Sequence, residues 1–155
     1  MINKFIAAVF FSGALALPLH AQDSTVAPTA ATQTDAISQA IGAPQAGKAL
    51  VVFFRPSAFK GGGINFKVRE NDVELGRLRS GNYFVLQVEP GTHSYVVHAE
   101  NKDLTTLETE AGETYFISGE VNFGFMSGRP NLSPSNREAF EAAFKKLKPS
   151  KPLED

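Results

Sequence analysis

The feature that most constrains the fold is a series of short segments in which apolar and polar residues alternate. In INFKVR, residues 64–69, every second side chain is apolar. This period of two is typical of a β-strand with one buried and one solvated face. Together with runs of β-branched and aromatic residues, and with turn signals such as Pro90-Gly91, it predicts strands over the following ranges: 50–54, 64–69, 73–75, 83–88, 92–99, 104–109 and 114–123.

Strands at a spacing of about 8–12 residues, with no helical pattern between them, indicate antiparallel pairing and argue against a β-α-β architecture. The sequence therefore predicts a mainly β fold, a single antiparallel β-sandwich of about seven strands with one C-terminal α-helix. The predicted domain spans residues 48–148, and residues 149–155 form a tail.

The C-terminal helix is predicted over residues 134–147. Pro134 suits a first helical turn, and Ser135 with Glu138 fits a capping box. An apolar stripe at helical spacing includes Phe140 and Phe144. We expect this stripe to cover the sandwich, and the alternative is a docking face for a partner.

The N-terminal segment MINKFIAAVFFSGALALPLHA reads as a signal peptide over residues 1–21, with cleavage after Ala21. Its apolar core is too short to span a bilayer comfortably. Residues 22–47 are rich in Ala, Thr, Gln and Pro and predict a flexible linker, in which 34–41 could form a short helix. The mature product is expected to be periplasmic or secreted.

Composition excludes several classes of protein. The chain has no cysteine, which rules out a disulfide, a thiolate zinc site, a cysteine nucleophile and a lipid-modified N-terminal cysteine. The net charge is −1, and no basic cluster alternates with aromatic residues, so nucleic-acid binding is not expected. We expect no stable membrane span after signal cleavage and no lipid anchor.

One stretch, GAPQAGK at residues 42–48, has the glycine and lysine spacing of a nucleotide-binding P-loop. In a P-loop a strand leads into the glycines and a helix leads out, whereas here a predicted strand follows them. Ala49 also stands where a hydroxyl should hold magnesium. The stretch is therefore interpreted as the end of the linker, and no cofactor is expected.

Catalytic constellations are equally hard to build. His93 and His98 are five residues apart on one predicted strand, so they point to opposite faces and are expected to be exposed. Ser127 is out of register with a nucleophile elbow, and no histidine follows it. We therefore expect no enzyme activity and no metal site.

Two arginines each follow an apolar strand and precede a proline, in Arg55-Pro56 and Arg129-Pro130. Their planar guanidinium groups could hold strand-end carbonyls or, alternatively, a ligand. The glycine-rich stretch 60–63 is expected to connect two strands. The candidate residues for contact with a ligand or partner are Arg55, Tyr83, Arg129, Phe140 and Phe144.

The segments GKALVVFFRPSAF, VELGRLRSGNYFVLQVEPGTHSYVVHAE, AGETYFI and SGRPNLSP resemble the bacterial family known as domain of unknown function 2846. The resemblance covers roughly residues 47–147. The turn Pro90-Gly91-Thr92-His93 also resembles that of small extracellular sandwich domains related to the transthyretin-like fold. The resemblance implies an exported β-sandwich and no particular activity. Many members look like lipoproteins, from which this chain departs because it lacks the cysteine.

These observations predict an exported, noncatalytic cell-envelope protein that acts as a protein–protein interaction or structural module. The alternative is a module that binds a small ligand or a glycan such as peptidoglycan, with Arg55, Tyr83 and the 60–63 loop near one rim. Both functions need only an exposed rim on the same scaffold.

Overall fold

The structure, a computed structural model, describes residues 30–98, 102–123, 128–151 and 153. This part of the chain is mainly β, with nine strands and two short helices. In chain order the elements are α1 (Ala30–Ile41), β1 (Ala49–Arg55), β2 (Phe66–Glu70), β3 (Val73–Leu78), β4 (Asn82–Val88), β5 (Gly91–His98), β6 (Lys102–Thr109), β7 (Thr114–Phe123), β8 (Gly128–Ser135), α2 (Arg137–Phe144) and β9 (Lys148–Pro149).

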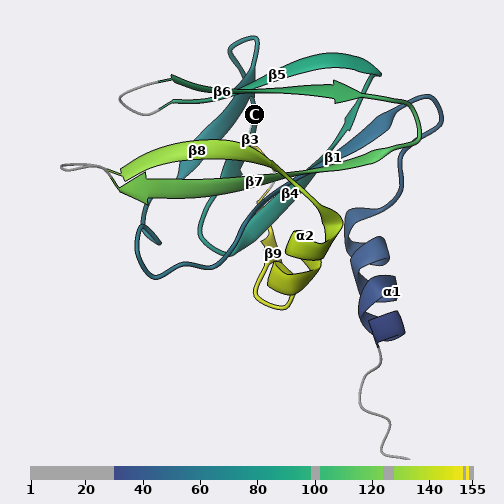
Figure 1. The fold of residues 1–155 in the computed structure, drawn as a ribbon, viewed down its shortest axis with the longest axis horizontal. Coiled ribbons are helices and arrows are strands. Elements are labelled where there is room, and N and C mark those ends of the chain that lie inside the picture. The colour runs from purple at the N-terminus through teal and green to yellow at the C-terminus, as the bar shows by residue number, and fades with distance from the viewer. Residues whose placement is uncertain (1–29, 99–101, 124–127, 152, 154–155) are drawn as a thin grey trace, which may run out of the picture.

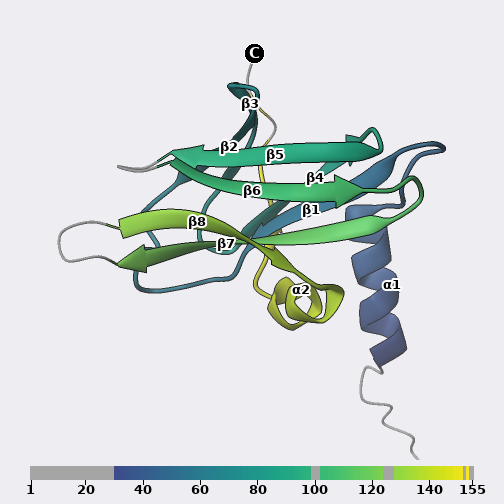
Figure 2. The ribbon, with the colours of Figure 1, turned by 45° about the horizontal axis from the view of Figure 1, so that its top comes forward.

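The strands form two sheets that lie face to face. One sheet has five strands in the order β8-β7-β1-β4-β9, and the other has four in the order β3-β2-β5-β6. Both helices lie on the side of the five-stranded sheet that faces away from the four-stranded one (Figures 1 and 2). The five-stranded sheet is therefore the middle of three layers.

Strand β1 lies at the centre of the middle layer and is buried along its whole length. Val51 and Phe53 face the four-stranded sheet and share a hydrophobic cluster with Tyr95. Leu50 and Phe54 alternate with them and face the helices. The continuous apolar sequence of this strand follows from its burial on both faces.

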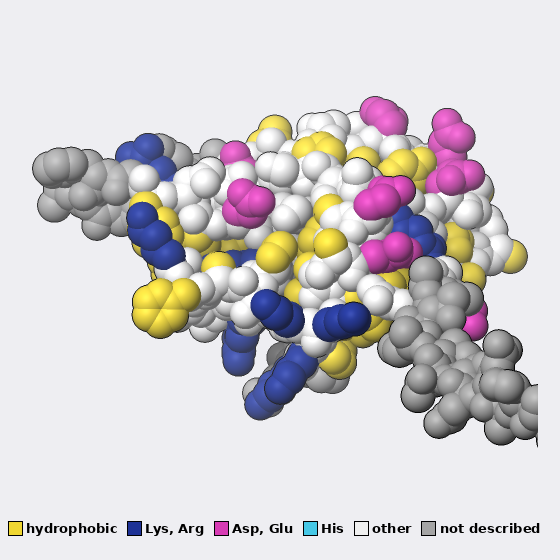
Figure 3. All heavy atoms as spheres, turned by 60° about the horizontal axis from the view of Figure 1, so that its bottom comes forward, with side chains coloured by type: hydrophobic (Ala, Val, Ile, Leu, Met, Phe, Trp, Pro, Cys, Tyr) yellow, Lys and Arg dark blue, Asp and Glu magenta, His cyan; other side chains and the backbone are white. Residues whose placement is uncertain are grey.

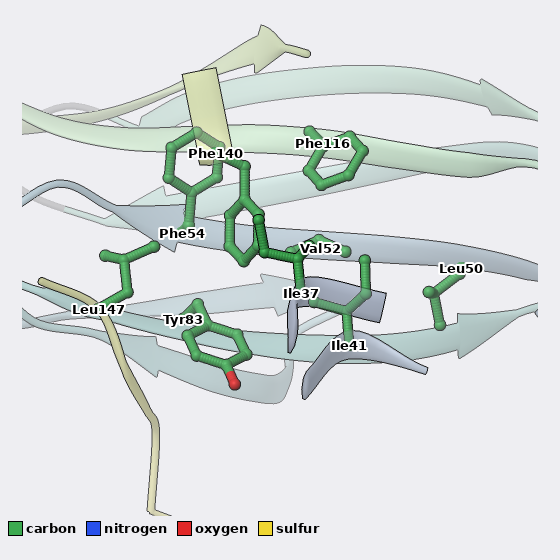
Figure 4. Packing of buried hydrophobic residues seen from close by; sticks show 9 residues of the cluster. All are labelled: Ile37, Ile41, Leu50, Val52, Phe54, Tyr83, Phe116, Phe140 and Leu147. Carbon is green, nitrogen blue, oxygen red and sulfur yellow. The ribbon is translucent and has the colours of Figure 1, made fainter. Parts of the chain in front are cut away.

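A second cluster joins the helices to the five-stranded sheet (Figure 4). The ring of Phe140 in α2 meets Phe54 edge to face, with centroids 5.3 Å apart, and Tyr83 at 5.6 Å. Ile37 and Ile41 of α1 are buried in the same cluster. The apolar stripe of the C-terminal helix thus covers the sheet, as we expected.

The fold prediction is right that the protein is mainly β and wrong in its details. The seven predicted strands correspond to β1 to β7, but β8 and β9 add to them. The pairing is not wholly antiparallel, because β1 runs parallel to β7 and β4 runs parallel to β9. Strand β8 was missed because its sequence GRPNLSPS contains two prolines, which an edge strand tolerates.

The C-terminal helix is shorter than predicted at both ends. Pro134 and Ser135 pair with β7 as the end of β8. Asn136 caps the helix, since its side-chain oxygen accepts a hydrogen bond from the Ala139 amide at 2.9 Å. After Phe144 the chain turns, and Lys148 continues into β9.

A second helix, α1, replaces much of the predicted flexible linker. Residues 22–29 and the predicted signal peptide 1–21 lie outside the described residues. Stretch 42–48 joins α1 to β1, with Gly42 and Gly47 at φ values of 75° and 78°. The predicted strand does follow the glycines, opposite to the order in a P-loop. No helix in the described part of the chain is long and apolar enough to cross a membrane.

Candidate functional site

Arg55 holds the loop between β1 and β2 from inside the protein. Its side chain is buried, and its guanidinium group donates to the carbonyl oxygens of Ile64 and, at 2.8 Å, of Gly61. The same group lies 5.4 Å from the centre of the Phe66 ring. Burial lowers the pKa of the guanidinium. Arg55 therefore hydrogen-bonds to backbone carbonyl groups, which is the first of the two roles predicted for it. It is not accessible to a ligand, which was the second.

The predicted aromatic contacts are also largely internal. Phe140 is fully buried, so it is not available to a partner in the folded domain. Tyr83 packs against it from β4, and burial raises the pKa of the Tyr83 hydroxyl. Phe144 is half-buried, and its ring centroid lies 6.4 Å from that of Tyr83.

Arg129 does not join the other candidate residues. It is exposed on β8, opposite Asn122 of β7. Strands β7 and β1 separate β8 from β4, which carries Tyr83. The structure thus brings Tyr83, Phe140 and Phe144 together but leaves Arg129 at the opposite edge of the five-stranded sheet.

The two histidines are not equivalent. His98 is exposed, as predicted, and its Nδ1 lies 3.1 Å from Arg69. His93 was predicted to be exposed but is half-buried. Its Nδ1 lies 2.9 Å from the Glu70 carboxylate and its Nε2 lies 2.8 Å from the Glu89 carbonyl oxygen. Both ring nitrogens of His93 are therefore engaged within the fold. Ser127 lies outside the described residues.

A surface groove follows the outer edge of β4, where the chain returns after α2. It consists of two adjoining hollows of about 320 and 520 Å³, which we call together the C-terminal groove. Both hollows share the residues from Pro149 to Lys151 and Leu153. The smaller hollow is also lined by Ala40, Leu75, Gly76, Tyr83, Phe84, Val85 and Leu86, and the larger one by Arg77, Arg79, Ser80, Gly81, Asn82 and Lys148.

The turn between β3 and β4 is built by Asn82, whose side chain is buried. Its Oδ1 accepts from the Arg79 amide at 2.7 Å, and its Nδ2 donates to the Arg77 carbonyl at 3.1 Å. Gly81 occupies the left-handed region at a φ of 74°, which glycine adopts without strain. The turn therefore fixes the backbone from which the two arginine side chains project.

The returning segment is fastened to this turn by backbone and side-chain hydrogen bonds. The amides of Lys148 and Ser150 donate to the carbonyls of Gly81 and Tyr83, at 3.0 and 2.7 Å. The Ser150 hydroxyl donates to the Arg77 carbonyl at 3.1 Å. Lys148 and Lys151 are thereby held next to the arginines of the β3–β4 turn.

Among the described residues that line the larger hollow, four are cationic and none is acidic. Arg77 is partly neutralised from outside the hollow by Glu74, which also pairs with Lys67. Hydrogen bonds from these two cations lower the pKa of Glu74 to about 2. Among the described residues, Arg79, Lys148 and Lys151 have no carboxylate within ion-pair distance.

Acidic and basic side chains also gather in different regions of the wider surface. On the face in Figure 3, most basic side chains gather toward the lower left and most acidic ones toward the upper right.

Sequence reasoning did not identify this cationic cluster. It singled out Tyr83, but not the arginines that precede it. It also placed Lys148 directly after the predicted helix 134–147 and not in a strand. The signal that could have found the cluster is the pair of basic residues on each side: RLR before Gly81 and KPSK after the helix.

A family model described as a protein of unknown function, DUF2846, matches residues 45–129, more than half of the chain. The match confirms the resemblance seen in the sequence. It includes the β3–β4 side of the C-terminal groove but ends before Lys148 and Lys151. A search of curated proteins gives no match. The chain belongs to the DUF2846 family.

Proposed function

We propose that the protein is an exported, noncatalytic module of the cell envelope that binds an anionic partner macromolecule in the C-terminal groove. The observation that carries this proposal is the larger hollow, whose lining in the described part of the chain holds four cations and no carboxylate. Opposite charge across an interface speeds association and excludes wrong partners. The adjoining smaller hollow offers apolar side chains, which supply binding energy by burial.

Export is supported by the N-terminal sequence, which has a positive start, a short apolar core and a small residue at the expected cleavage position. The absence of cysteine from the chain is consistent with a product that carries no lipid on an N-terminal cysteine. We place the protein in the periplasm or outside the cell.

A noncatalytic role is supported by the state of the histidines. His93 has both ring nitrogens bonded to oxygen atoms of the fold, and His98 is exposed on the opposite face of β5. Within the residues that the structure describes, no three side chains of the metal-binding types form a cluster. In the groove, the arginines, lysines and serines that the structure describes include no base beside a nucleophile.

A second candidate function is the binding of a small ligand or a glycan such as a peptidoglycan fragment. The volume of the larger hollow, about 520 Å³, favours it, because small-molecule sites have volumes of about 300–1,000 Å³. Arg55 is buried and takes no part in this version of the site.

The test is crosslinking of the exported protein in cells, followed by mass spectrometry. The double variant Arg79→Glu, Lys151→Glu reverses two charges of the groove. The matched control Lys145→Glu, Arg129→Glu makes the same change of net charge at exposed positions outside it. We expect specific partners that disappear in the first variant and persist in the control.

Equal crosslinking in both variants would show that the groove is not the contact. Recovery of peptidoglycan-linked material alone, lost in the groove variant, would favour the second candidate function.

A further inference from the structure

In the C-terminal groove, part of the outer edge of β4 has no partner strand among the described residues. Residues of β4 alternate in the direction of their backbone groups, as in any strand. The Tyr83 carbonyl accepts from the Ser150 amide, so the backbone groups of Tyr83 point away from β1 and toward β9. Two residues further on, the N–H and C=O of Val85 point the same way.

The hydrogen bonds on the other side of β1 confirm the direction in which the Val85 backbone groups point. The Leu50 amide donates to the Glu113 carbonyl, so Leu50 directs its backbone groups toward β7. Val52 lies opposite Val85 and is two residues from Leu50, so its backbone groups also point toward β7. The N–H and C=O of Val85 are therefore not used within the β1–β4 ladder.

Among the described residues, the only strands that pair with β4 are β1 and β9, and no hydrogen bond from a turn or loop reaches the Val85 backbone. Strand β9 covers only Asn82 and Tyr83. Beyond Val85 the edge is closed again, because the Gln87 side chain bonds to the Ala43 carbonyl and the Gln45 amide, each at 3.0 Å. The open edge is thus short and bounded at both ends.

The open edge lies in the smaller hollow, which is lined from both faces of β4. Tyr83 and Val85 face the helix side, and Phe84 and Leu86 face the four-stranded sheet. An extended peptide places alternate side chains on opposite faces, so it would reach both linings at once. Lys151 borders both hollows and connects this edge to the cationic cluster.

We infer that the C-terminal groove binds an extended acidic peptide segment of a partner protein, which adds a short strand to β4 at Val85. This inference rests on the proposed function and specifies its partner. Main-chain hydrogen bonds to Val85 hold the segment, and its carboxylates pair with Arg79, Lys148 and Lys151. A glycan has no regular series of N–H and C=O groups with which to meet this edge.

The test uses a blocked synthetic peptide of alternating valine and glutamate, with a peptide of alternating valine and lysine as its charge control. Val85→Pro removes the outward N–H, which the β1–β4 ladder does not use. Val85→Ala is the matched variant that keeps the N–H but shortens the side chain. We expect the acidic peptide alone to bind, and Val85→Pro to weaken its binding by about tenfold while Val85→Ala has a smaller effect.

A second measurement does not depend on the folding of the proline variant. Hydrogen exchange of the Val85 amide in the unchanged protein should slow when the acidic peptide is added. Unchanged exchange at Val85 in a peptide-bound sample would overturn strand addition, as would equal affinity of the proline and alanine variants.

An oligomer of galacturonic acid separates this inference from the proposed function. One outcome is that this oligomer binds, that the variant Arg79→Glu, Lys151→Glu abolishes its binding, and that the acidic peptide does not bind. In that case the peptide inference is wrong, whereas the proposal that the groove binds anions stands. If neither probe binds, the peptide inference fails and the crosslinking experiment decides the proposed function.

Discussion

The ring of Phe84 occupies the space that a side chain at Gly76 would need. A Cβ atom at Gly76 would lie 2.7 Å from the ring, and the ring is itself stacked on Phe53 at a centroid distance of 4.9 Å. Because Phe53 belongs to the fully buried β1, the Phe84 ring has little freedom to retreat. This contact sets how closely β3 and β4 approach beside the C-terminal groove.

Gly76→Ala should therefore lower the free energy of unfolding by about 1–3 kcal/mol, as overpacking of a core does. Chemical denaturation monitored by circular dichroism would measure the change. Gly63→Ala is the control, since nothing lies within 4 Å of a Cβ at Gly63. A loss of stability at Gly63 as large as that at Gly76 would contradict the packing argument.

Phe140→Ala should cost about 3–5 kcal/mol, the usual effect of removing a fully buried phenyl ring. Phe59 offers a matched substitution, because its side chain is fully exposed. Thermal unfolding of Phe59→Ala should match that of the unchanged protein. If both variants melt alike, α2 does not pack on the five-stranded sheet in solution.

Tyr95→Phe should leave the stability unchanged or raise it by about 1 kcal/mol. The Tyr95 hydroxyl is buried in the cluster between the sheets and has no hydrogen-bond partner in the described part of the chain. Burial accordingly raises the pKa of this hydroxyl. Removing an unpaired buried polar group carries little penalty.

The comparison for Tyr95 is Tyr115→Phe, which removes an acceptor that lies 3.0 Å from the Glu110 amide. That variant should lose about 0.5–1.5 kcal/mol in the same denaturation experiment. A marked loss in Tyr95→Phe would instead reveal a bonded hydroxyl.

Glu74 should contribute a pH-dependent part of the folding stability. Its pKa is lowered from 4.5 to about 2 in the folded protein by hydrogen bonds from Arg77 and Lys67. A lowered carboxyl pKa stabilises the fold above the unfolded value, and this stabilisation is lost as the pH falls from about 4.5 to about 2. Melting temperatures measured across that range should fall less steeply for Glu74→Gln. Parallel curves for the two proteins would show that the pairing is not formed.

The strands with a clear alternation or an apolar run could be predicted from sequence because their burial repeats along the chain. Strand β8 was not predicted because Pro130 and Pro134 interrupt the pattern that usually indicates a strand. Strand β9 escaped because two residues, Lys148 and Pro149, carry no period at all. The extent of helix α1 was not predicted because the segment is rich in Ala, Thr, Gln and Pro, which indicates a linker. Its two isoleucines, Ile37 and Ile41, which lie on one helical face, predicted only a short helix.

The candidate site was harder to predict because its parts meet only through tertiary structure. Arg79 and Lys151 are far apart in sequence, and the β9 pairing that unites them has no local signature. Arg55 became a candidate because it follows an apolar strand and precedes a proline, and Phe140 because it belongs to the apolar stripe of the predicted helix. Their burial shows that the same residue types also serve as internal supports.

The parallel pairing of β1 with β7 sets an order of events for the nascent chain. The segment ALVVFFR is made early, yet one of its two neighbours in the sheet arrives only with residues 114–118. Until then the edge of β1 that pairs with β7 has no partner strand, and apolar segments rich in β-branched and aromatic residues, such as LVVFF, tend to aggregate. We therefore expect the strand that contributes to both hydrophobic clusters of the folded protein to be a segment through which newly made chains can associate until β7 has been synthesised.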